Sequence, residues 1–134
     1  MKKIDKIGGI ILRGKKLLVV KKRTKDNRSE YIIPGGKREG NETDFETLKR
    51  ELQEEIQVEL LSAEPFGGFD DIAIFENIPI HIEVYFANIV GEPTCDSEIK
   101  ELVWIYRNYE KKGIKLGSVL AKFVIPKLIE LEMM

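Results

Sequence analysis

The sequence predicts one α/β domain in which a mixed β-sheet is covered by helices. Three observations support this prediction: short β-prone runs open the chain, an amphipathic helical segment follows them, and further strands precede a second helical segment. The chain of 134 residues is about the size of one domain, and no repeat, low-complexity tract or linker divides it. Residues 1–134 are therefore expected to form a single unit.

Four segments are expected to be strands. Residues 7–12 and 17–20 are apolar runs separated by the polar, glycine-containing segment 13–16, which is typical of a hairpin. Residues 80–90 alternate between two sets of side chains with a period of two, as a half-buried strand does. Residues 102–106, centred on a Val-Trp-Ile sequence, are the fourth predicted strand.

Two segments are expected to be helices. The first covers residues 44–57, where Thr43 followed by Glu46 matches a capping box that satisfies backbone N–H groups at the helix start. Its apolar stripe recurs every three or four residues, at Phe45, Leu48, Leu52 and Ile56. The second helix covers residues 118–131, and Pro126 is expected to kink it.

Charge and cysteine content narrow the class of protein. The chain has 22 Lys and Arg against 23 Asp and Glu, so it lacks the positive field of a non-specific binder of nucleic-acid polymers. Cys95 is the single cysteine and cannot form an internal disulfide, which fits a reducing cytoplasm. No apolar run approaches the ~18 residues that cross a membrane, so a cytoplasmic protein without a membrane partner is expected.

Three glutamates of the first predicted helix, Glu51, Glu54 and Glu55, fall within a stripe roughly 100° wide. Carboxylates this close repel one another, and a divalent cation would relieve the repulsion. Carboxylate oxygens are hard ligands that suit Mg²⁺ or Mn²⁺, and Arg50 is placed to fix one of them. The alternative is a solvated acidic face, which is the commoner explanation for such a helix seen alone.

The sequence Pro34-Gly35-Gly36-Lys37 lies just upstream of this helix. Two adjacent glycines let the backbone approach an ion or a ligand closely, and a carbonyl there can supply a metal ligand. Lys37 can act as a point charge on a phosphate. Taken alone, the segment would be an ordinary turn, but its place beside the acidic helix favours a functional site.

Together these residues resemble the Nudix hydrolase signature, G-x5-E-x7-R-E-U-x-E-E-x-G-U, in which U is a bulky aliphatic residue. The matching positions here are Gly36, Glu42, Arg50, Glu51, Leu52, Glu54, Glu55 and Val58. Gln57 departs from the pattern, because the family has glycine there. Glycine would serve as a left-handed helix cap, and glutamine in that conformation costs roughly 1 kcal/mol, so the helix is expected to run on or to end differently.

The resemblance spans most of the chain and implies a small MutT-like member. The implied fold is a Nudix-type α/β/α sandwich with a mixed β-sheet between helices. The resemblance implies Mg²⁺ as the bound metal, with Mn²⁺ as its substitute. The implied ligands are the side chains of Glu51, Glu54 and Glu55 and the carbonyl of Gly35.

The resemblance also implies roles for neighbouring residues. Glu42 would brace the loop, and Arg50 would orient a catalytic glutamate. Small members often use one more acid from a loop before a later strand. Glu98 is expected there as a catalytic residue and metal ligand, with Glu101 less favoured, although either can equally be surface charge.

The activity implied is hydrolysis of a nucleoside diphosphate bearing a further group X. The metal would neutralise the diphosphate and lower the pKa of bound water, while a glutamate takes the water's proton. We expect Glu51 to be this base, with Glu98 as the competing candidate and Glu54 as a further catalytic residue.

The leading expectation for the substrate is a nucleoside triphosphate, including an oxidised one such as 8-oxo-dGTP, cleaved to the monophosphate and pyrophosphate. Alternatives are ADP-ribose-like nucleotide sugars and dinucleoside polyphosphates. A non-catalytic nucleotide-binding regulatory domain is a different class, disfavoured because all three carboxylates are present; a metal-independent interaction module is a third. Monomer and homodimer both stay open.

Segment 21–28 carries five cations in eight residues and is a candidate for steering an anionic substrate, with Arg23 as the favoured contact by analogy with similar proteins. A solvated loop is at least as good an interpretation of this segment. Four aromatic side chains are candidates for stacking on a nucleobase, although such residues more often belong to the core. They are Tyr31, Phe66, Phe69 and Phe75.

Overall fold

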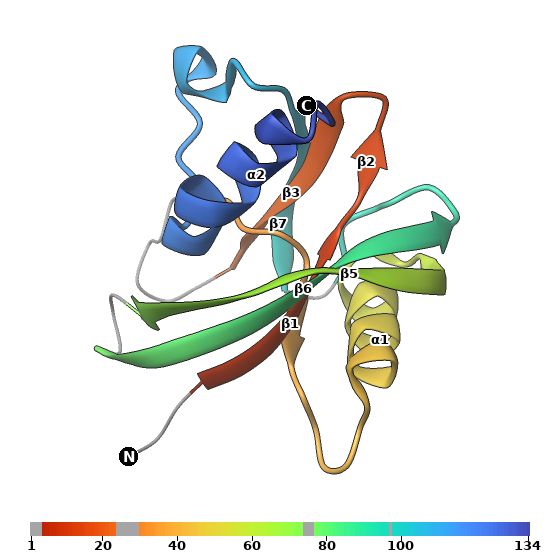
Figure 1. Cartoon of the computed structure of the whole chain (residues 1–134). Helices are drawn as coiled ribbons and strands as arrows, with labels where there is room; N and C mark the ends of the chain where they lie inside the picture. The colour runs from red at the N-terminus through yellow and green to blue at the C-terminus, as the bar shows by residue number, and fades with distance from the viewer. Residues whose placement is uncertain (1–3, 24–29, 74–76, 97) are drawn as a thin grey trace.

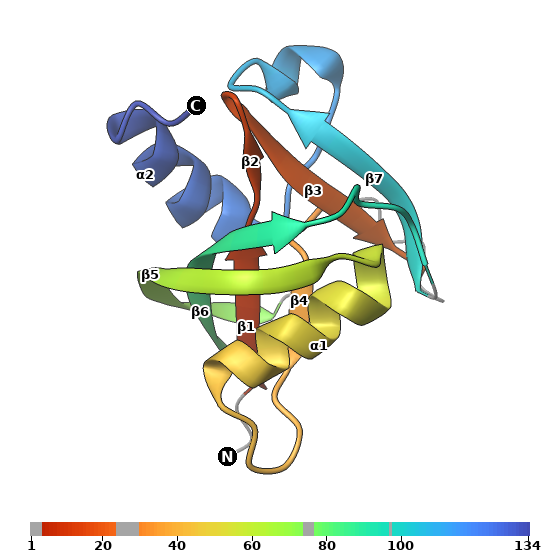
Figure 2. The ribbon, with the colours of Figure 1, turned by 90° about the vertical axis from the view of Figure 1, so that its right-hand side faces the viewer.

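The computed structural model describes residues 4–23, 30–73, 77–96 and 98–134. Two β-sheets form the centre of the molecule, and helices α1 and α2 lie on opposite sides of strands β5 and β6 (Figures 1 and 2). The predicted α/β fold is thus confirmed, with the strands divided between two sheets. None of the helices within the described residues is long and apolar enough to cross a membrane.

The four-stranded sheet has the order β4-β1-β6-β5. Strand β1 (Ile4–Ile10) is parallel to β6 (Ile78–Val90) and antiparallel to β4 (Gly35–Lys37). Strand β5 (Glu59–Ala73) pairs antiparallel with β6 along most of its length. This sheet is therefore mixed, as expected, and it brings the glycine segment of β4 to one edge.

The three-stranded sheet has the order β2-β3-β7 and is antiparallel. Strand β2 (Leu12–Arg13) and strand β3 (Lys16–Lys22) form the predicted hairpin, and β3 also pairs with β7 (Ile99–Ile105). The residues before β2, which the prediction placed in the same hairpin, belong to β1 in the other sheet.

Strand β5 is a long strand that the sequence analysis did not predict. It contains Pro65, Gly67 and Gly68, residues that normally interrupt a strand. Strand β5 lies at the edge of the sheet and has only β6 as a neighbour, so the N–H that Pro65 lacks is not needed for pairing with a second strand. The pairing register also shifts between Pro65 and Gly67, which is typical of a β-bulge. The proline, the glycines and the bulge interrupt the strand pattern in the sequence, although β5 pairs with the whole of β6.

Helix α1 (Asp44–Ile56) begins with the predicted capping box. The Glu46 N–H donates to Thr43 Oγ1, and the Thr43 N–H donates to the Glu46 carboxylate. The buried side chains of Leu48, Leu52 and Ile56 pack on the four-stranded sheet, which leaves the acidic stripe beside this apolar face.

The C-terminal helical segment begins at Ser118, as predicted, and contains a π-helical turn. That turn covers Leu120–Val124, the Ile125 N–H donates to the Leu120 carbonyl, and α2 (Ile125–Glu130) follows. Pro126 offers no N–H to the preceding turn, so the break expected at Pro126 takes the form of a widened turn. A single 3₁₀ turn, Tyr109–Lys112, precedes this segment.

Candidate active site

Two glycines of β4 shape the edge of the sheet where the acidic helix meets it. Gly35 has φ of 145°, and a Cβ there would lie 2.1 Å from the Ile7 carbonyl oxygen. A Cβ on Gly36 would lie 2.5 Å from the carboxyl carbon of Glu51. Position 35 therefore requires glycine, whereas a side chain at position 36 would displace the Glu51 carboxylate, which lies directly against the backbone there.

Arg50 connects the acidic stripe to the loop before the helix. Its Nε and Nη2 donate to the two oxygens of Glu42, at 2.8 and 2.9 Å, and Nη2 also donates to the Lys37 carbonyl. Nη1 donates to Glu51 at 2.9 Å and reaches Glu54 at 3.5 Å. These bonds, chiefly those to Glu42, raise the pKa of Arg50. Arg50 thus fixes the orientation of Glu51.

Glu42 is the partner that holds Arg50 in place. Besides the two bonds from Arg50, its carboxylate accepts from the Glu39 N–H at 2.9 Å and from Thr47 Oγ1 at 3.1 Å. The bonds from Arg50, followed by the Glu39 N–H, lower the pKa of Glu42 to about 2. Glu42 therefore braces the loop as a carboxylate, in the way the family resemblance implies.

Glu55 lies in a different environment. Its side chain is nearly buried, at 5% exposure for the residue. One carboxylate oxygen accepts from the Gly35 N–H at 2.9 Å, and the other is 3.0 Å from Lys22 Nζ. Burial raises the pKa of the Glu55 carboxyl, and the Lys22 charge opposes that shift. The Lys22 ammonium also reaches the Gly35 carbonyl at 3.4 Å.

The oxygen donors available here are of the kind that suits a hard divalent cation. They come from the side chains of Glu51, Glu54 and Glu55 and from the Gly35 carbonyl, and the missing Cβ of Gly36 leaves room for the Glu51 carboxylate. This donor set fits the metal site that the sequence predicts.

In the conformation described, each of these carboxylates faces a basic side chain. Arg50 holds Glu51 and Glu54, and Lys22 holds Glu55. Over the described ranges, no group of three His, Cys, Asp or Glu side chains converges as a metal-binding cluster. A cation that binds here must therefore replace part of these ion pairs.

Glu98 and Arg23 lie at the end of the three-stranded sheet. The Arg23 N–H donates to the Glu98 carbonyl at 2.7 Å, and Lys22 pairs with Ile99 in the register of β3 and β7. Glu98 therefore precedes a strand that runs beside Lys22. Glu101, the less favoured acid, accepts a short hydrogen bond from Tyr31 and lies 3.7 Å from Lys21.

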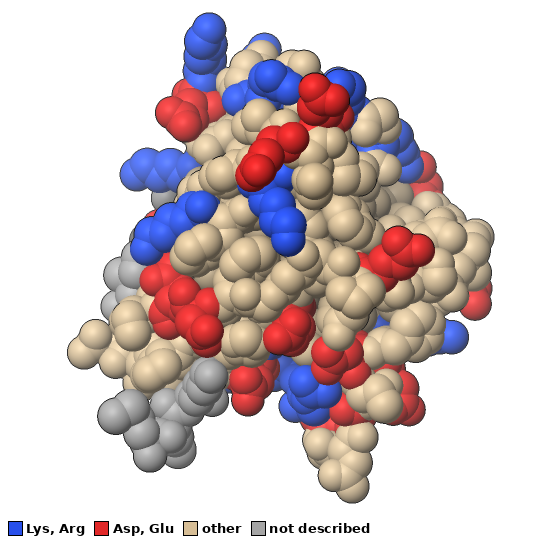
Figure 3. All heavy atoms as spheres, viewed as in Figure 1, with Lys and Arg blue, Asp and Glu red and all other residues tan. Residues whose placement is uncertain are grey.

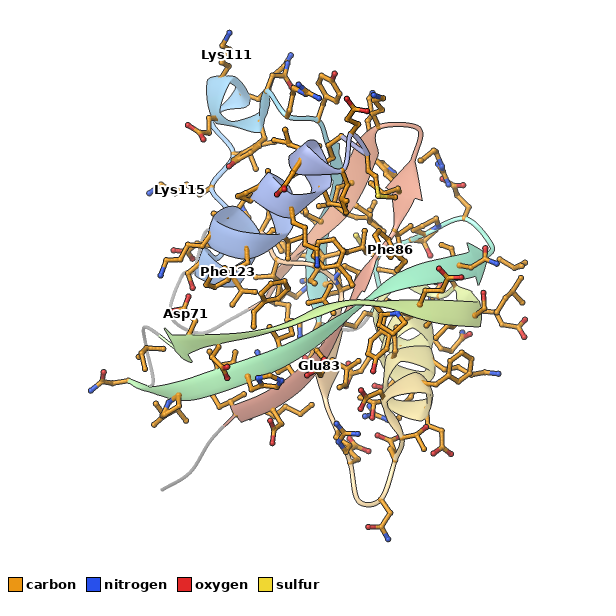
Figure 4. The ribbon with its side chains drawn as sticks, in the orientation of Figure 1. Asp71, Glu83, Phe86, Lys111, Lys115 and Phe123 are labelled. Atoms are coloured by element: carbon orange, nitrogen blue, oxygen red, sulfur yellow. The ribbon has the colours of Figure 1, made fainter. Side chains whose placement is uncertain are left out.

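The aromatic candidates Phe66 and Phe69 pack against other aromatic side chains. Phe66 is buried in the core, and the Phe69 ring stacks on Phe123 with centroids 5.2 Å apart. Phe86, which is labelled in Figure 4, contacts Phe66 edge to face. Phe75 and residues 24–29 of the basic loop lie outside the described residues.

A pocket of about 410 Å³ lies against β4, whose Gly35 and Gly36 also contact Glu55 and Glu51; no residue of the acidic helix is among the residues that line it. Gly35, Gly36, Lys22 and Lys37 form part of its wall, whereas Arg23 and the three described aromatic candidates do not. The remaining wall is mainly aliphatic and includes Ile32, Ile72, Ile80, Ile82, Leu116 and Leu120. Its polar and apolar parts suit a ligand with a charged end and a flat apolar end.

Several of these pocket residues were missed by the sequence analysis. The alternation in residues 80–90 already placed Ile80 and Ile82 on one face, and this was the available signal. Lys22 was one of five cations in a charged segment, and nothing in the sequence distinguished it from its neighbours.

The face of the molecule shown in Figure 3 carries both acidic and basic side chains. This agrees with the net charge of −1.

Comparison with known proteins assigns the family. A model of the NUDIX domain matches residues 2–109. Among solved structures, the E. coli ORF135 protein is 25% identical with a TM-score of 0.71, covering 87% of this chain and 82% of its own. A MutT NUDIX hydrolase from Burkholderia pseudomallei is 24% identical with a TM-score of 0.71, covering 78% and 84%.

A third structure, a bifunctional NMN adenylyltransferase/ADP ribose pyrophosphatase from Francisella tularensis, has a TM-score of 0.72 at 17% identity. The match covers 96% of this chain and 41% of that one. No protein in the curated set matches the sequence. Since the family model covers most of the chain, this protein belongs to the Nudix family and is a Nudix hydrolase. Nudix hydrolases generally use a divalent metal and act on small nucleotide substrates.

Proposed function

We propose that this protein is a Mg²⁺-dependent pyrophosphohydrolase that cleaves a nucleoside triphosphate, including an oxidised one, to the monophosphate and pyrophosphate. The observation that carries the proposal is the junction between the acidic helix and the pocket. Gly35 and Lys22 contact Glu55 and also form part of the pocket wall. A ligand in the pocket would therefore have its charged end beside the carboxylates.

Glu51, Glu54 and Glu55 and the Gly35 carbonyl would hold the metal ion. When bound, the metal would supply neutralisation of the diphosphate and a lower pKa for a coordinated water. Basic side chains face two of these carboxylates: Arg50 lies beside Glu51 and Lys22 beside Glu55. Hard oxygen ligands of this kind favour Mg²⁺, with Mn²⁺ as a substitute.

Glu51 is the proposed general base. Arg50 Nη1 binds only one of its oxygens in the described contacts, at 2.9 Å, and so orients the carboxylate without enclosing it. Glu98 is the competing candidate, since it precedes β7 where that strand runs beside Lys22. Replacing each by glutamine and following the pH dependence of kcat would separate the two roles.

Binding of the substrate would divide between the two parts of the pocket. The aliphatic wall formed by Ile72, Ile80 and Ile82 would contact the base and sugar. Lys37, which is exposed at the pocket, would act as a point charge on a phosphate. Arg23 stays a proposed contact for the leaving phosphates, reaching them from outside this wall.

The test is product analysis with a panel of substrates and metals. The purified protein is incubated with nucleoside triphosphates, their oxidised forms, ADP-ribose and dinucleoside polyphosphates, with Mg²⁺, with Mn²⁺ or with a chelator. Metal-dependent release of a nucleoside monophosphate and pyrophosphate supports the proposal. AMP with ribose phosphate would instead assign a nucleotide-sugar substrate, and no metal-dependent product from any compound would contradict catalysis.

A further inference from the structure

His81 of β6 uses both nitrogens of its ring to contact carboxylates. Nδ1 lies 2.8 Å from Asp70 Oδ1 on β5, and Nε2 lies 2.6 Å from Glu83 Oε1 on β6. A neutral imidazole carries a single N–H, so it can donate to only one of the two carboxylates. The imidazolium form has two N–H groups and satisfies both. The geometry is therefore that of an imidazolium held between two carboxylates.

The surroundings of His81 favour this charge. Residues 51–99 include no Lys or Arg, so His81 is the one basic side chain that β5 and β6 carry. Strand β1 contributes Asp5, which pairs with His81 in the register and thus lies on the same face. The hydrogen bonds to Glu83 and Asp70 raise the pKa of His81 above its ordinary value of 6.5, against the opposing effect of burial.

A second charge-paired cluster lies further along the same face, at the start of α1. Tyr85, two residues beyond Glu83 on β6, donates a hydrogen bond to the Asp44 carboxylate. Asp44 also pairs with Arg38 at 2.6 Å. Arg38 is thus engaged at this second cluster, next to the carboxylates that face His81.

Glu83 fits closely against the backbone of β5. A Cβ on Gly68, its partner in the register, would lie 2.6 Å from Glu83 Oε1, the oxygen that contacts His81. A side chain at position 68 would therefore push this carboxylate away from the ring. A glycine that weakens the strand pattern of β5 thus makes room for the cluster.

The opposite face of the same two strands forms part of the pocket wall. Ile80 and Ile82 flank His81 in β6, so their side chains point the other way, and both line the pocket. Asp71 of β5 points towards the C-terminal helical segment and pairs with Lys122 at 3.3 Å (Figure 4). The way in which β5 and β6 are held together at His81 therefore also sets the position of the aliphatic wall.

The sheet has few other supports at this end. Strand β5 is an edge strand, and the described pairing of β1 with β6 begins at Ile80. Cross-strand pairs of opposite charge stabilise the association of strands. If His81 loses a proton, one ring nitrogen presents a lone pair to a carboxylate oxygen, and the attraction across the two strands is replaced by repulsion.

We propose that His81 is a positioning residue for the pocket: as an imidazolium it holds Asp70 and Glu83 together and fixes the aliphatic wall, and loss of its proton weakens substrate binding. The inference rests on the proposed function, because it takes this wall as the contact for the base. A raised folded-state pKa gives stability that is fully present below pH 6.5 and is lost as the pH rises through the raised value. Substrate affinity should fall over the same range.

The charge of His81 can be read directly, because the protein has one histidine and its ring signals need no assignment. Untagged, ¹⁵N-labelled protein is titrated by NMR from mildly acidic to mildly alkaline pH. We expect both ring nitrogens to be protonated at pH 6.5 and the titration midpoint to lie above this value. In Asp70→Asn and Glu83→Gln the midpoint should move down towards 6.5. A wild-type midpoint at or below 6.5 would overturn the proposal.

Kinetics connect the charge of His81 to the pocket. Wild type, His81→Gln and Asp5→Asn are compared with Mg²⁺ and the nucleotide over the same pH range. At pH 6.5 the KM of His81→Gln should be about fivefold above that of wild type, with kcat changed much less. At alkaline pH the two KM values should converge. Asp5→Asn, which alters an acid on the same face without a described hydrogen bond to His81, should follow the wild-type pH dependence.

The outcomes separate this inference from the proposed function. A ratio of the KM values of His81→Gln and wild type that stays constant with pH would overturn the positioning role, while wild-type hydrolysis leaves the proposed function intact. Asp70→Asn, whose side chain is 72% exposed, replaces His81→Gln in the same assay if that variant folds poorly. A wild-type protein that hydrolyses no nucleotide would overturn the proposed function itself, on which the NMR titration does not depend.

Discussion

The acidic helix is held by two basic side chains that work in different ways. Arg50 binds Glu42, Glu51 and Glu54 through several nitrogens of one planar group and also binds a backbone carbonyl. Lys22 binds Glu55 through a single ammonium. A guanidinium fork with several partners cannot leave one of them without disturbing the others, whereas an ammonium can be exchanged.

This difference divides the carboxylates into two groups. Arg50 orients Glu42 and Glu51 through hydrogen bonds of 2.8–2.9 Å, and its bonds to Glu42 are the chief cause of the lowered pKa of Glu42. Glu55 lies in a nearly buried position, where its described partners are the Lys22 ammonium and the Gly35 N–H. The comparison implies that the first group sets geometry and that the second responds to the presence of a cation.

The largest expected effect comes from removing a carboxylate that is exposed enough to leave the fold intact. The side chain of Glu54 is 58% exposed, so Glu54→Gln should fold normally and lose about 10³-fold in kcat, because a proposed metal ligand is lost. Steady-state kinetics with Mg²⁺ measure this, and circular dichroism confirms the fold. Glu59→Gln, an exposed substitution beyond the helix, is the control. More than a tenth of wild-type activity in Glu54→Gln would contradict the assignment.

The next prediction tests whether the planar guanidinium group of Arg50, with its several donors, matters beyond its positive charge. Arg50→Lys keeps the charge but cannot bind Glu42 and Glu51 in the same geometry, so we expect roughly a hundredfold loss in kcat/KM. The free energy of unfolding should fall by about 1–3 kcal/mol, because partly buried hydrogen bonds are lost. Urea titration measures the stability. Wild-type behaviour in both assays would remove the contrast between Arg50 and Lys22.

The pH dependence of stability tests the charged state of Glu42. Its pKa in the folded protein is about 2, below the ordinary value of 4.5. A lowered folded-state pKa gives stability that is present above pH 4.5 and is lost as the pH falls towards 2. The free energy of unfolding of wild type should therefore exceed that of Glu42→Gln at neutral pH. This difference in the free energy of unfolding should shrink as the pH falls from 4.5 towards 2. A difference that stays constant over this range would contradict an ionised Glu42 paired with Arg50.

The smallest effect concerns the end of the acidic helix. Gln57 adopts the left-handed conformation that the family gives to glycine, with φ of 59°, so the expectation that the helix runs on or ends differently was wrong. Gln57 Nε2 donates to Asp96 and Thr94 Oγ1 donates to Gln57 Oε1, each at 2.8 Å. These bonds offset the backbone cost.

Two substitutions separate these contributions. Gln57→Ala keeps the backbone strain and loses both bonds, so it should destabilise the protein by about 1 kcal/mol. Gln57→Gly relieves the strain and should stay within about 0.5 kcal/mol of wild type. Thermal and urea unfolding of the two variants measure this. Equal stability of the alanine and glycine variants would show that the left-handed conformation is not costly here.

The first helix could be predicted from the sequence because its determinants are local. The capping pair Thr43 and Glu46, the apolar stripe and the spacing of the glutamates all lie within one segment. The structure confirms the capping box and buries Leu48, Leu52 and Ile56, whereas Phe45, which the prediction placed in the same stripe, is exposed. The neighbourhood of Gly35 and Gly36 was predicted for the same reason. The assignment of individual catalytic roles stays a prediction.

Features that depend on distant partners could not be read in this way. Strand β5 was missed because Pro65 and Gly67 mask its pattern, and its pairing with β6 only becomes visible in the fold. The roles of Lys22 and of the core residue Phe66 depend on which elements pack against them. Charge and aromaticity in a sequence do not reveal the side chain's partner.

Gln57 also has a consequence for how the two proposed acidic elements are connected. Its side chain fastens the end of α1 to residues 94 and 96, and the N–H groups of Thr94 and Asp96 donate to carbonyls of Ile56 and Glu55. The segment leading towards Glu98 is thus clamped to the helix that carries the other acids. A residue with no proposed chemical part in hydrolysis would therefore help to set the distance between the acidic helix and the loop that carries Glu98.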